Sequence, residues 1–278
     1  MSEIDDKVKS LRDVLVQHQQ QIGKMAMGGV TAEDLIRVAL VSARKTPKLL
    51  DCDPKSVVAA LQRAAQFGVR PNTAHDHGYL LPRYDSLVKG QAATFELSYK
   101  GMIYLAIRSG QVLDMWSEAV YERDLFRAPR GHERSIIHER EMSADPGPLV
   151  AAYAIAKLAN GTMKDEVLSL FDIHTTMAYV AKSKNTTIDS LSGPWKENLG
   201  AMAKKTAIRR LFKVLGIGPG EDDEEMPEAA QTEAPRVVSH GKGASALASA
   251  LQPKALGQGN GAGVIDASGV AEPLEVNG

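Results

Sequence analysis

Two neighbouring stretches decide the fold class: residues 78–84, which read GYLLPRY, and residues 93–99, which read ATFELSY. Both mix aromatic and aliphatic side chains, and a loop containing Gly90 separates them, a pattern typical of paired strands. The residues that follow predict a short helix at 102–107, closed by Gly110, and three more strands at 112–121, 149–158 and 167–170. Helical spacing returns at 171–182 and 195–215. The sequence therefore predicts an α+β fold, in which helices flank a central, mostly antiparallel sheet.

The residues before this region are helical in pattern. Residues 1–29 form an N-terminal amphipathic segment, because apolar positions recur at alternating spacings of four and three until Gly28 and Gly29 end the pattern. The positions in this seam are Ile4, Val8, Leu11, Leu15, His18, Ile22 and Met25. We expect one long helix whose seam packs against a neighbouring subunit, the alternative being that it packs on the core of its own chain.

Two more helices are expected before the first strand. Thr31 is a suitable N-cap for the second helix, with Asp34 in its acidic first turn. Asp53 and Pro54 predict the start of the third, since Asp caps helices and Pro is favoured at the first helical position. Gly68 predicts its end.

Charge is distributed unevenly along the chain. Residues 221–278 hold 10 acidic and 3 basic residues, a net charge of −7, and they contain no Phe, Trp or Tyr. The whole-chain totals of 34 acidic and 33 basic residues leave 24 and 30 in residues 1–220, a net charge of +6. A Gly/Ala/Pro-rich, acidic segment cannot bury enough apolar area to offset its ordering entropy, so a disordered C-terminal tail is expected at 221–278. Residues 30–220 then form the core domain.

Composition also excludes several classes of protein. No apolar run approaches the ~18 residues of a membrane span, and residues 1–10 lack the apolar core of a signal peptide. We therefore expect a cytoplasmic protein with no membrane partner. Cys52 is the only cysteine, which excludes an intrachain disulfide and a multi-cysteine zinc site.

The strongest chemical signal is a concentration of positive charge late in the core domain. On a helix, Lys205, Arg209 and Lys213 form a stripe at i, i+4 and i+8 beside the apolar face, with Arg210 further round. Like charges in a row repel, and a polyanion along the helix would remove that cost. The alternative is an ordinary solvated face. Eight basic residues fall in this region: Lys182, Lys184, Lys196, Lys204, Lys205, Arg209, Arg210 and Lys213.

Three other cations have distinctive positions. Lys204 falls on the apolar side of the helix, so it must extend to solvent or meet a partner. Lys100 follows a predicted strand, and Gly101 beside it allows close backbone approach, which suits a phosphate. Arg108 ends the next helix, where it also complements the helix dipole.

Four further features carry weaker signals. His75 and His77 resemble half a metal site, but a solvent-exposed loop is the simpler reading. Carboxylates on both sides of Cys52 raise a thiol pKa, which disfavours a nucleophile. Trp195 could stack on a base, although a buried helix anchor is favoured over this role. The glycines at 216, 218 and 220 follow a helix and precede acidic residues, so they indicate a hinge, and no Walker-type phosphate loop occurs.

Seven blocks of sequence follow one another in a distinctive order: residues 51–57 (DCDPKSV), 79–82 (YLLP), 99–103 (YKGMI), 106–110 (AIRSG), 120–126 (VYERDLF), 193–195 (GPW) and 202–211 (MAKKTAIRRL). In this order and spacing, the blocks resemble the RecT family of phage-type single-strand DNA annealing recombinases, and the resemblance spans roughly residues 30–216. The stretch 75–77 departs from the family pattern, and residues 221–278 have no counterpart in it.

The resemblance implies a protein that binds single-stranded DNA and anneals complementary strands without ATP, through an annealed duplex intermediate. It also implies homo-oligomeric rings or helical filaments, a 5′-to-3′ exonuclease partner, contact with the host single-strand binding protein, and a bacterial host cytoplasm. The residues expected to line the DNA path are Lys100, Arg108, Lys182, Lys184, Lys204, Lys205, Arg209, Arg210 and Lys213.

Annealing involves no covalent chemistry, so no catalytic residue, no enzyme activity and no metal site are expected. No cofactor is expected to be required, with Mg²⁺ acting only through the DNA. Two alternatives stay open: a metal-dependent nuclease that uses His75, His77 and carboxylates, and a passive DNA-coating protein that protects strands without annealing them.

Overall fold

The segment 78–97 forms an antiparallel hairpin. In a computed structural model of the protein, β1 (Gly78–Asp85) pairs with β2 (Gly90–Leu97), so that Gly78 lies opposite Leu97. Leu80, Phe95 and Leu97 are buried on the face of the hairpin that meets the N-terminal helices. The structure describes residues 3–85, 89–132, 134–142 and 145–218, which all lie within one unit of the chain, residues 1–235.

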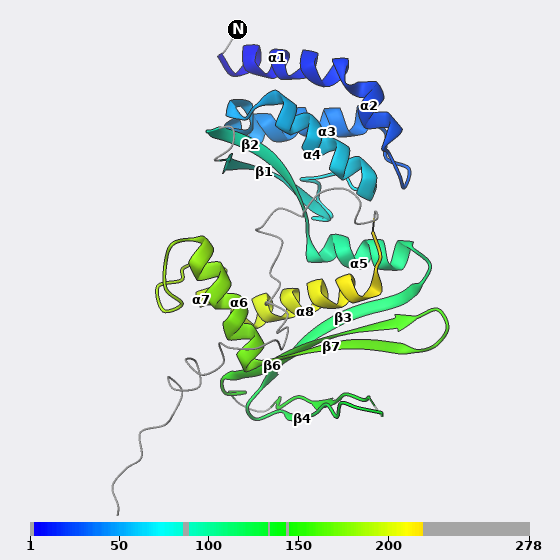
Figure 1. Cartoon of the computed structure of the whole chain (residues 1–278), viewed down its shortest axis with the longest axis vertical. Coiled ribbons are helices and arrows are strands. Elements are labelled where there is room, and N and C mark those ends of the chain that lie inside the picture. Colours follow the sequence, from blue (N-terminus) through cyan, green and yellow to red (C-terminus); the bar gives the residue numbers. More distant parts are fainter. Residues whose placement is uncertain (1–2, 86–88, 133, 143–144, 219–278) are drawn as a thin grey trace, which may run out of the picture. The chain divides into compact units, whose positions relative to one another are not determined.

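The N-terminal helices are α1 (Glu3–Gln17), α2 (Gln19–Lys24), α3 (Ala32–Lys45), the 3₁₀ helix η1 (Pro47–Asp51) and α4 (Pro54–Phe67). The capping residues that the sequence predicts for the second and third helices are found at the ends of α3 and α4. The Thr31 side chain accepts a hydrogen bond from the Asp34 backbone N–H at 3.1 Å, and Asp53 caps α4 through the Lys55 N–H at 3.4 Å. Gly68 ends α4 in the left-handed conformation, with φ 60°. These helices lie on one side of the β1–β2 hairpin (Figure 1).

The expectation of one long N-terminal helix is wrong, and the structure favours the alternative that the seam packs on the core of its own chain. The helix breaks at His18, whose Nδ1 hydrogen-bonds the Val14 carbonyl at 2.9 Å, so that α1 and α2 are separate. The core of the same chain buries four seam residues, Val8, Leu11, Leu15 and Ile22. The reason is local, because the apolar stripe of α3 follows after a short connection and packs against α1 and α2.

A three-stranded antiparallel sheet forms the second layer of the molecule. It contains β3 (Val112–Tyr121), β6 (Leu149–Leu158) and β7 (Met163–Ser169) in the order β3-β6-β7. The strands predicted at 112–121 and 149–158 match these bounds, and β7 begins before the predicted 167. Ala152, Ala154 and Ala156 of β6 are buried, and their small side chains allow a helix to pack closely on the sheet.

A short hairpin that the sequence does not predict covers the other face of this sheet. It consists of β4 (Leu125–Arg127) and β5 (Ile137–Glu139), with Phe126 opposite His138. Phe126 packs on the buried residues Val120 and Tyr153. The strands therefore form three separate antiparallel sheets, β1-β2, β3-β6-β7 and β4-β5, among the described residues.

The remaining helices complete the fold. They are α5 (Tyr99–Arg108), α6 (Leu170–Ser183), α7 (Pro194–Glu197) and α8 (Leu199–Leu215). Figure 1 shows α8 between α5 and the β3-β6-β7 sheet, and α8 contacts both. The predicted α+β class with antiparallel pairing is confirmed. The predicted tail at 221–278 lies outside the described residues, and in the described part no helix is long and apolar enough to span a bilayer.

Candidate nucleic-acid interface

Helix α8 carries the predicted cationic stripe, and its burial pattern fixes which way the stripe points. Asn198 caps the helix by accepting a hydrogen bond from the Ala201 N–H at 3.1 Å, and Gly216 ends it with φ 63°. One face is buried against α5 and the sheet, formed by Ala203, Thr206, Ala207, Ile208, Leu211 and Phe212. The helix therefore cannot rotate without exposing this core, and the charged side is held in one orientation.

Lys205 and Arg209 lie beside the β1–β2 hairpin and the start of α5. The Lys205 ammonium lies 5.6 Å from the centroid of the Tyr99 ring, within the range of a cation–π contact. Burial lowers the pKa of the half-buried Arg209 guanidinium, and nearby Glu96 raises it, but arginine stays charged at physiological pH. Arg209 makes no hydrogen bond or ion pair within the described ranges. Its five N–H donors are therefore available to an anion such as a phosphate.

The two other predicted lysines of α8 differ in their surroundings. Lys213 is exposed in the last turn, on the same stripe as Arg209. Lys204 lies 3.9 Å from the Glu118 carboxylate of β3, and both side chains are partly exposed. The prediction that Lys204 must extend to solvent or meet a partner is confirmed, and this contact with Glu118 reduces the positive charge that Lys204 offers to DNA.

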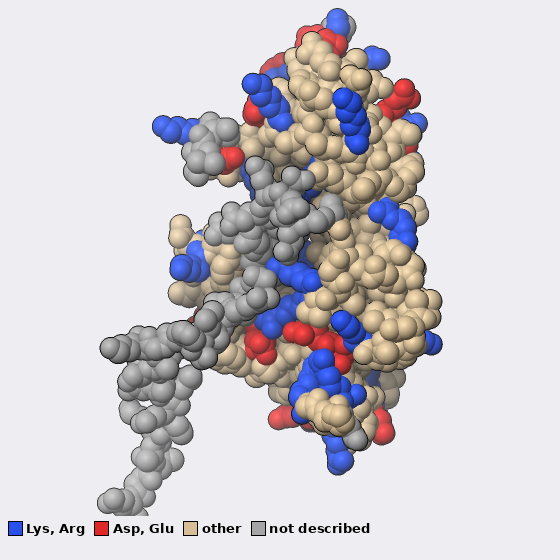
Figure 2. All heavy atoms as spheres, turned by 45° about the vertical axis from the view of Figure 1, so that its right-hand side comes forward, with Lys and Arg blue, Asp and Glu red and all other residues tan. Residues whose placement is uncertain are grey.

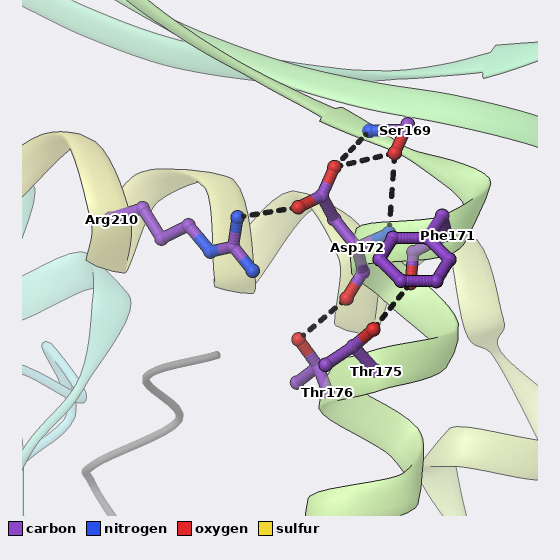
Figure 3. A network of polar contacts seen from close by, with 6 residues as sticks. All are labelled: Ser169, Phe171, Asp172, Thr175, Thr176 and Arg210. Atoms are coloured by element: carbon purple, nitrogen blue, oxygen red, sulfur yellow. Dashed lines mark hydrogen bonds and ion pairs between the residues drawn. The ribbon is translucent and has the colours of Figure 1, made fainter. Parts of the chain in front are cut away.

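Arg210 points away from the stripe into a polar network at the start of α6. Figure 3 shows it reaching Asp172, and its Nη1 lies 3.2 Å from the Asp172 carboxylate. Asp172 and Ser169 form a reciprocal capping box, in which Asp172 also accepts the Ser169 N–H at 3.0 Å. Burial raises the pKa of Asp172, but the bonds from Ser169 and Arg210 outweigh it and leave that pKa below its ordinary value. Arg210 thus joins α8 to α6.

Arg108 and Lys100, both on α5, also have protein partners. Arg108 Nη1 and Nη2 donate to the carbonyls of Gly68 and Phe67 at 3.0 and 2.6 Å, so its side chain caps the C-terminus of α4. Lys100 pairs with Asp76 at 3.1 Å. Gly101 also has a structural role, because a Cβ there would lie 2.0 Å from the His77 carbonyl oxygen.

Lys182 and Lys184 are exposed at the end of α6. They lie on a different element from the α8 stripe, beside a hollow lined by Ala178, Asn185 and Ile188. On the face shown in Figure 2, Lys and Arg atoms gather at the height at which Figure 1 places α8, and again at the height of the β4–β5 hairpin. Arg127 ends β4, and Arg130 and Arg134 lie between β4 and β5. Sequence reasoning did not identify these cations as a group, because hairpins this short have no clear sequence signal. Asp165 pairs with Arg130 and Arg134.

The structure also shows the surroundings of the residues with weaker sequence signals. Trp195 is buried, as the helix-anchor reading predicts. Burial, followed by Asp51 and Asp53, raises the pKa of the Cys52 thiol. Within the described ranges no group of three or more His, Cys, Asp or Glu residues is arranged to hold a metal ion. Two neighbours of the cationic stripe, Tyr99 and Glu96, were missed because they contact α8 only through the tertiary fold.

A mixed α/β core with a fixed, outward cationic stripe is typical of a nucleic-acid-binding protein. Comparison with known proteins narrows this class, because residues 33–237 match the RecT family. The chain is 36% identical to Protein RecT of Escherichia coli (strain K12) over 201 residues, 72% of each chain. It is 29% identical to the uncharacterized protein YqaK of Bacillus subtilis (strain 168) over 166 residues, 59% of this chain and 52% of that one. The chain belongs to the RecT family, whose members are single-strand annealing proteins of DNA recombination.

Proposed function

We propose that this protein binds single-stranded DNA along α8 and pairs complementary strands without ATP. The single observation that carries the proposal is the α8 stripe, where Arg209 is partly desolvated and keeps its donors unused. Desolvated cations hold phosphates more strongly than fully hydrated ones, because the local dielectric is lower. Lys205 and Lys213, one helical turn to either side, extend the stripe.

Phosphate contacts carry no sequence information, so such a surface binds any strand. Base pairing between the two strands then supplies specificity and much of the driving force. The residues proposed for the DNA path are Lys205, Arg209 and Lys213, with Lys100, Lys182, Lys184 and Lys204 further along it. Arg108 and Arg210 act on the fold, because their guanidinium groups are engaged with protein partners.

The same proposal extends to the assembly and its partners. Residues 30–220 form the annealing core, which works as a homo-oligomeric ring or filament together with a 5′-to-3′ exonuclease and the host single-strand binding protein. In this proposal no cofactor is required, and Mg²⁺ modulates the reaction through the DNA. The assembly and the protein partners are proposed from the resemblance to the RecT family.

Annealing of two complementary oligonucleotides, labelled as a fluorescence donor–acceptor pair, tests the proposal. The full-length protein, without any nucleotide, should accelerate duplex formation well above the spontaneous rate. An acceleration that requires ATP would overturn the proposal. Binding without acceleration would assign the protein to passive coating of DNA.

The same labelled strands, run on a denaturing gel after incubation with Mg²⁺, test the nuclease alternative. Intact strands are the expected result, and cleavage by pure protein would overturn the proposal. The geometry at His75 and His77 disfavours that alternative. Their rings are tilted by 22° with centroids 5.5 Å apart, and two nearly parallel rings cannot both hold one ion in their planes at a ligand distance of about 2 Å.

A further inference from the structure

His75 and His77, which have no part in the function proposed above, form a stack of rings with Tyr104 on α5. The ring centroids of His77 and Tyr104 are 4.3 Å apart with a tilt of 15°, and those of His75 and His77 are 5.5 Å apart with a tilt of 22°. The Arg108 guanidinium lies 5.2 Å from the Tyr104 centroid. We call these three rings the aromatic ladder. Segments from two different parts of the fold thus meet in one stack.

The ladder is built into the fold by backbone contacts. The Ser98 N–H donates to the His77 carbonyl at 3.0 Å, and the Ser98 hydroxyl donates to the Asp76 carbonyl. Gly101 lets that same His77 carbonyl lie against the first turn of α5. Asp76 adopts a left-handed φ of 54° and pairs with Lys100. The loop is therefore fixed to α5 at four points, and its rings are held in place before any ligand arrives.

The two ends of the ladder differ. At one end, Arg108 is tied to the carbonyls of Phe67 and Gly68, so that end is closed. At the other end His75 is exposed, and Tyr104 is 37% exposed along the side. Burial, together with His75 and Arg108, lowers the pKa of His77, which favours the neutral ring at physiological pH. A preorganised ring stack with one exposed end is the kind of surface on which bases of single-stranded DNA stack.

We propose that a nucleobase of the bound strand stacks on His75 and extends the aromatic ladder by one ring. This inference rests on the proposed function, because it assigns a base contact to the strand whose phosphates meet α8. Every base has a π-face, so the contact tolerates any sequence, as annealing requires.

Binding of two fluorescent oligonucleotides of equal length, one normal and one abasic at every internal position, tests this proposal. The abasic strand keeps its phosphates and lacks the bases. The His75→Ala variant should bind the normal strand about fivefold more weakly than wild type, the lower end of the range for one stacked base. It should bind the abasic strand as wild type does. Its salt slope should be unchanged, because stacking releases no counterions.

Two control variants complete the experiment. His174→Ala removes an exposed histidine of α6 and should leave both affinities unchanged. Tyr104→Phe keeps the ring and should bind as wild type, whereas Tyr104→Leu should lose affinity for the normal strand only. The ladder contact would be overturned if His75→Ala bound the normal strand as tightly as wild type does, or if it lost the same affinity for both strands. Either result would leave the proposed function standing. If wild type bound neither strand, the proposed function itself would fail, and the ladder contact with it.

Discussion

At the scale of single residues, Arg209 and Arg210 are adjacent in the sequence but have different surroundings. Arg210 is engaged by Asp172, whereas Arg209 has no ion-pair partner in the part of the chain that the structure describes. The sequence places Arg209 on the stripe and Arg210 further round the same helix, but it does not show which of the two meets a carboxylate. Their difference arises because α6 supplies a carboxylate on one side of α8, and no local pattern predicts which residue of another helix that will be.

Replacing Arg209 or Lys205 by Ala should weaken the salt dependence of single-strand binding. Each contact to a phosphate contributes about 0.7 to the slope of log affinity against log salt, so each variant should lose nearly that amount. Fluorescence anisotropy at several salt concentrations measures the slope. Lys9→Ala, at an exposed position of α1, is the matched control and should leave the salt slope unchanged. An unaltered slope in both α8 variants would remove this helix from the DNA path.

Arg108→Ala should lower the free energy of unfolding and leave the salt slope of DNA binding as it is in wild type. The variant leaves the Gly68 and Phe67 carbonyls without their charged donor, and a hydrogen bond of this kind contributes about 1.5–3 kcal/mol. Urea denaturation followed by circular dichroism measures the loss. A variant of undiminished stability but reduced salt slope would show that Arg108 contacts DNA instead.

At the scale of elements, caps were predictable because each depends on residues within one turn. Thr31, Asp53, Gly68 and Gly216 all lie where their side-chain chemistry or conformational freedom predicts. The β4–β5 hairpin was not predictable, because its strands have three residues each and it is held by a tertiary contact. In that contact, the buried His138 ring bridges Tyr153 at 3.0 Å and Asp124 at 3.1 Å.

Stability at acidic pH should depend on Asp124. Burial raises its pKa, but the backbone N–H groups of Tyr121 and Glu141, together with His138, outweigh burial and leave the pKa below its ordinary value. A carboxyl with a lowered folded pKa stabilises the fold above its unfolded pKa of about 3.9, and this contribution is lost as the pH falls through the folded pKa. Asp124→Asn should therefore reduce the unfolding free energy near neutral pH by about 1–3 kcal/mol and flatten its acid dependence. Urea titrations from neutral to acidic pH measure the unfolding free energies of wild type and Asp124→Asn. A parallel decrease in the two proteins as the pH falls would contradict this prediction.

Helix α1 should contribute to the stability of the same chain. Leu15 is 0% exposed and neighbouring Val16 is 49% exposed, which makes them a matched pair. Leu15→Ala should cost about 2–5 kcal/mol of unfolding free energy, because it leaves a cavity in the core, whereas Val16→Ala should cost well under 1 kcal/mol. Chemical denaturation of the two variants measures this. Equal, small losses would restore the idea that α1 packs on a neighbouring subunit.

At the scale of the whole molecule, the charge separation between residues 1–220 and 221–278 has consequences for DNA binding. Two hypotheses follow for residues 221–278: a tethered segment of −7 could compete with DNA for the cations of a body of +6, or it could recruit protein partners, which we favour slightly. The competition hypothesis is the one tested by truncation. Truncation after Gly220 should therefore strengthen single-strand binding at low salt. The gain should fade as the Debye length falls to about 8 Å near physiological salt. Equal affinities of the truncated and full-length proteins at low salt would instead favour recruitment of protein partners by this segment.

The position of α8 also sets a length scale for the DNA. A helix rises about 1.5 Å per residue, so Lys205, Arg209 and Lys213 recur about every 6 Å along α8. The core buries the opposite face of α8, so this spacing is fixed in the folded protein. Under the proposed function, a strand that gives one phosphate to each of these three cations would follow a straight row, with its bases turned away from the helix. The spacing of the cations would then set how many nucleotides one chain holds ready for pairing.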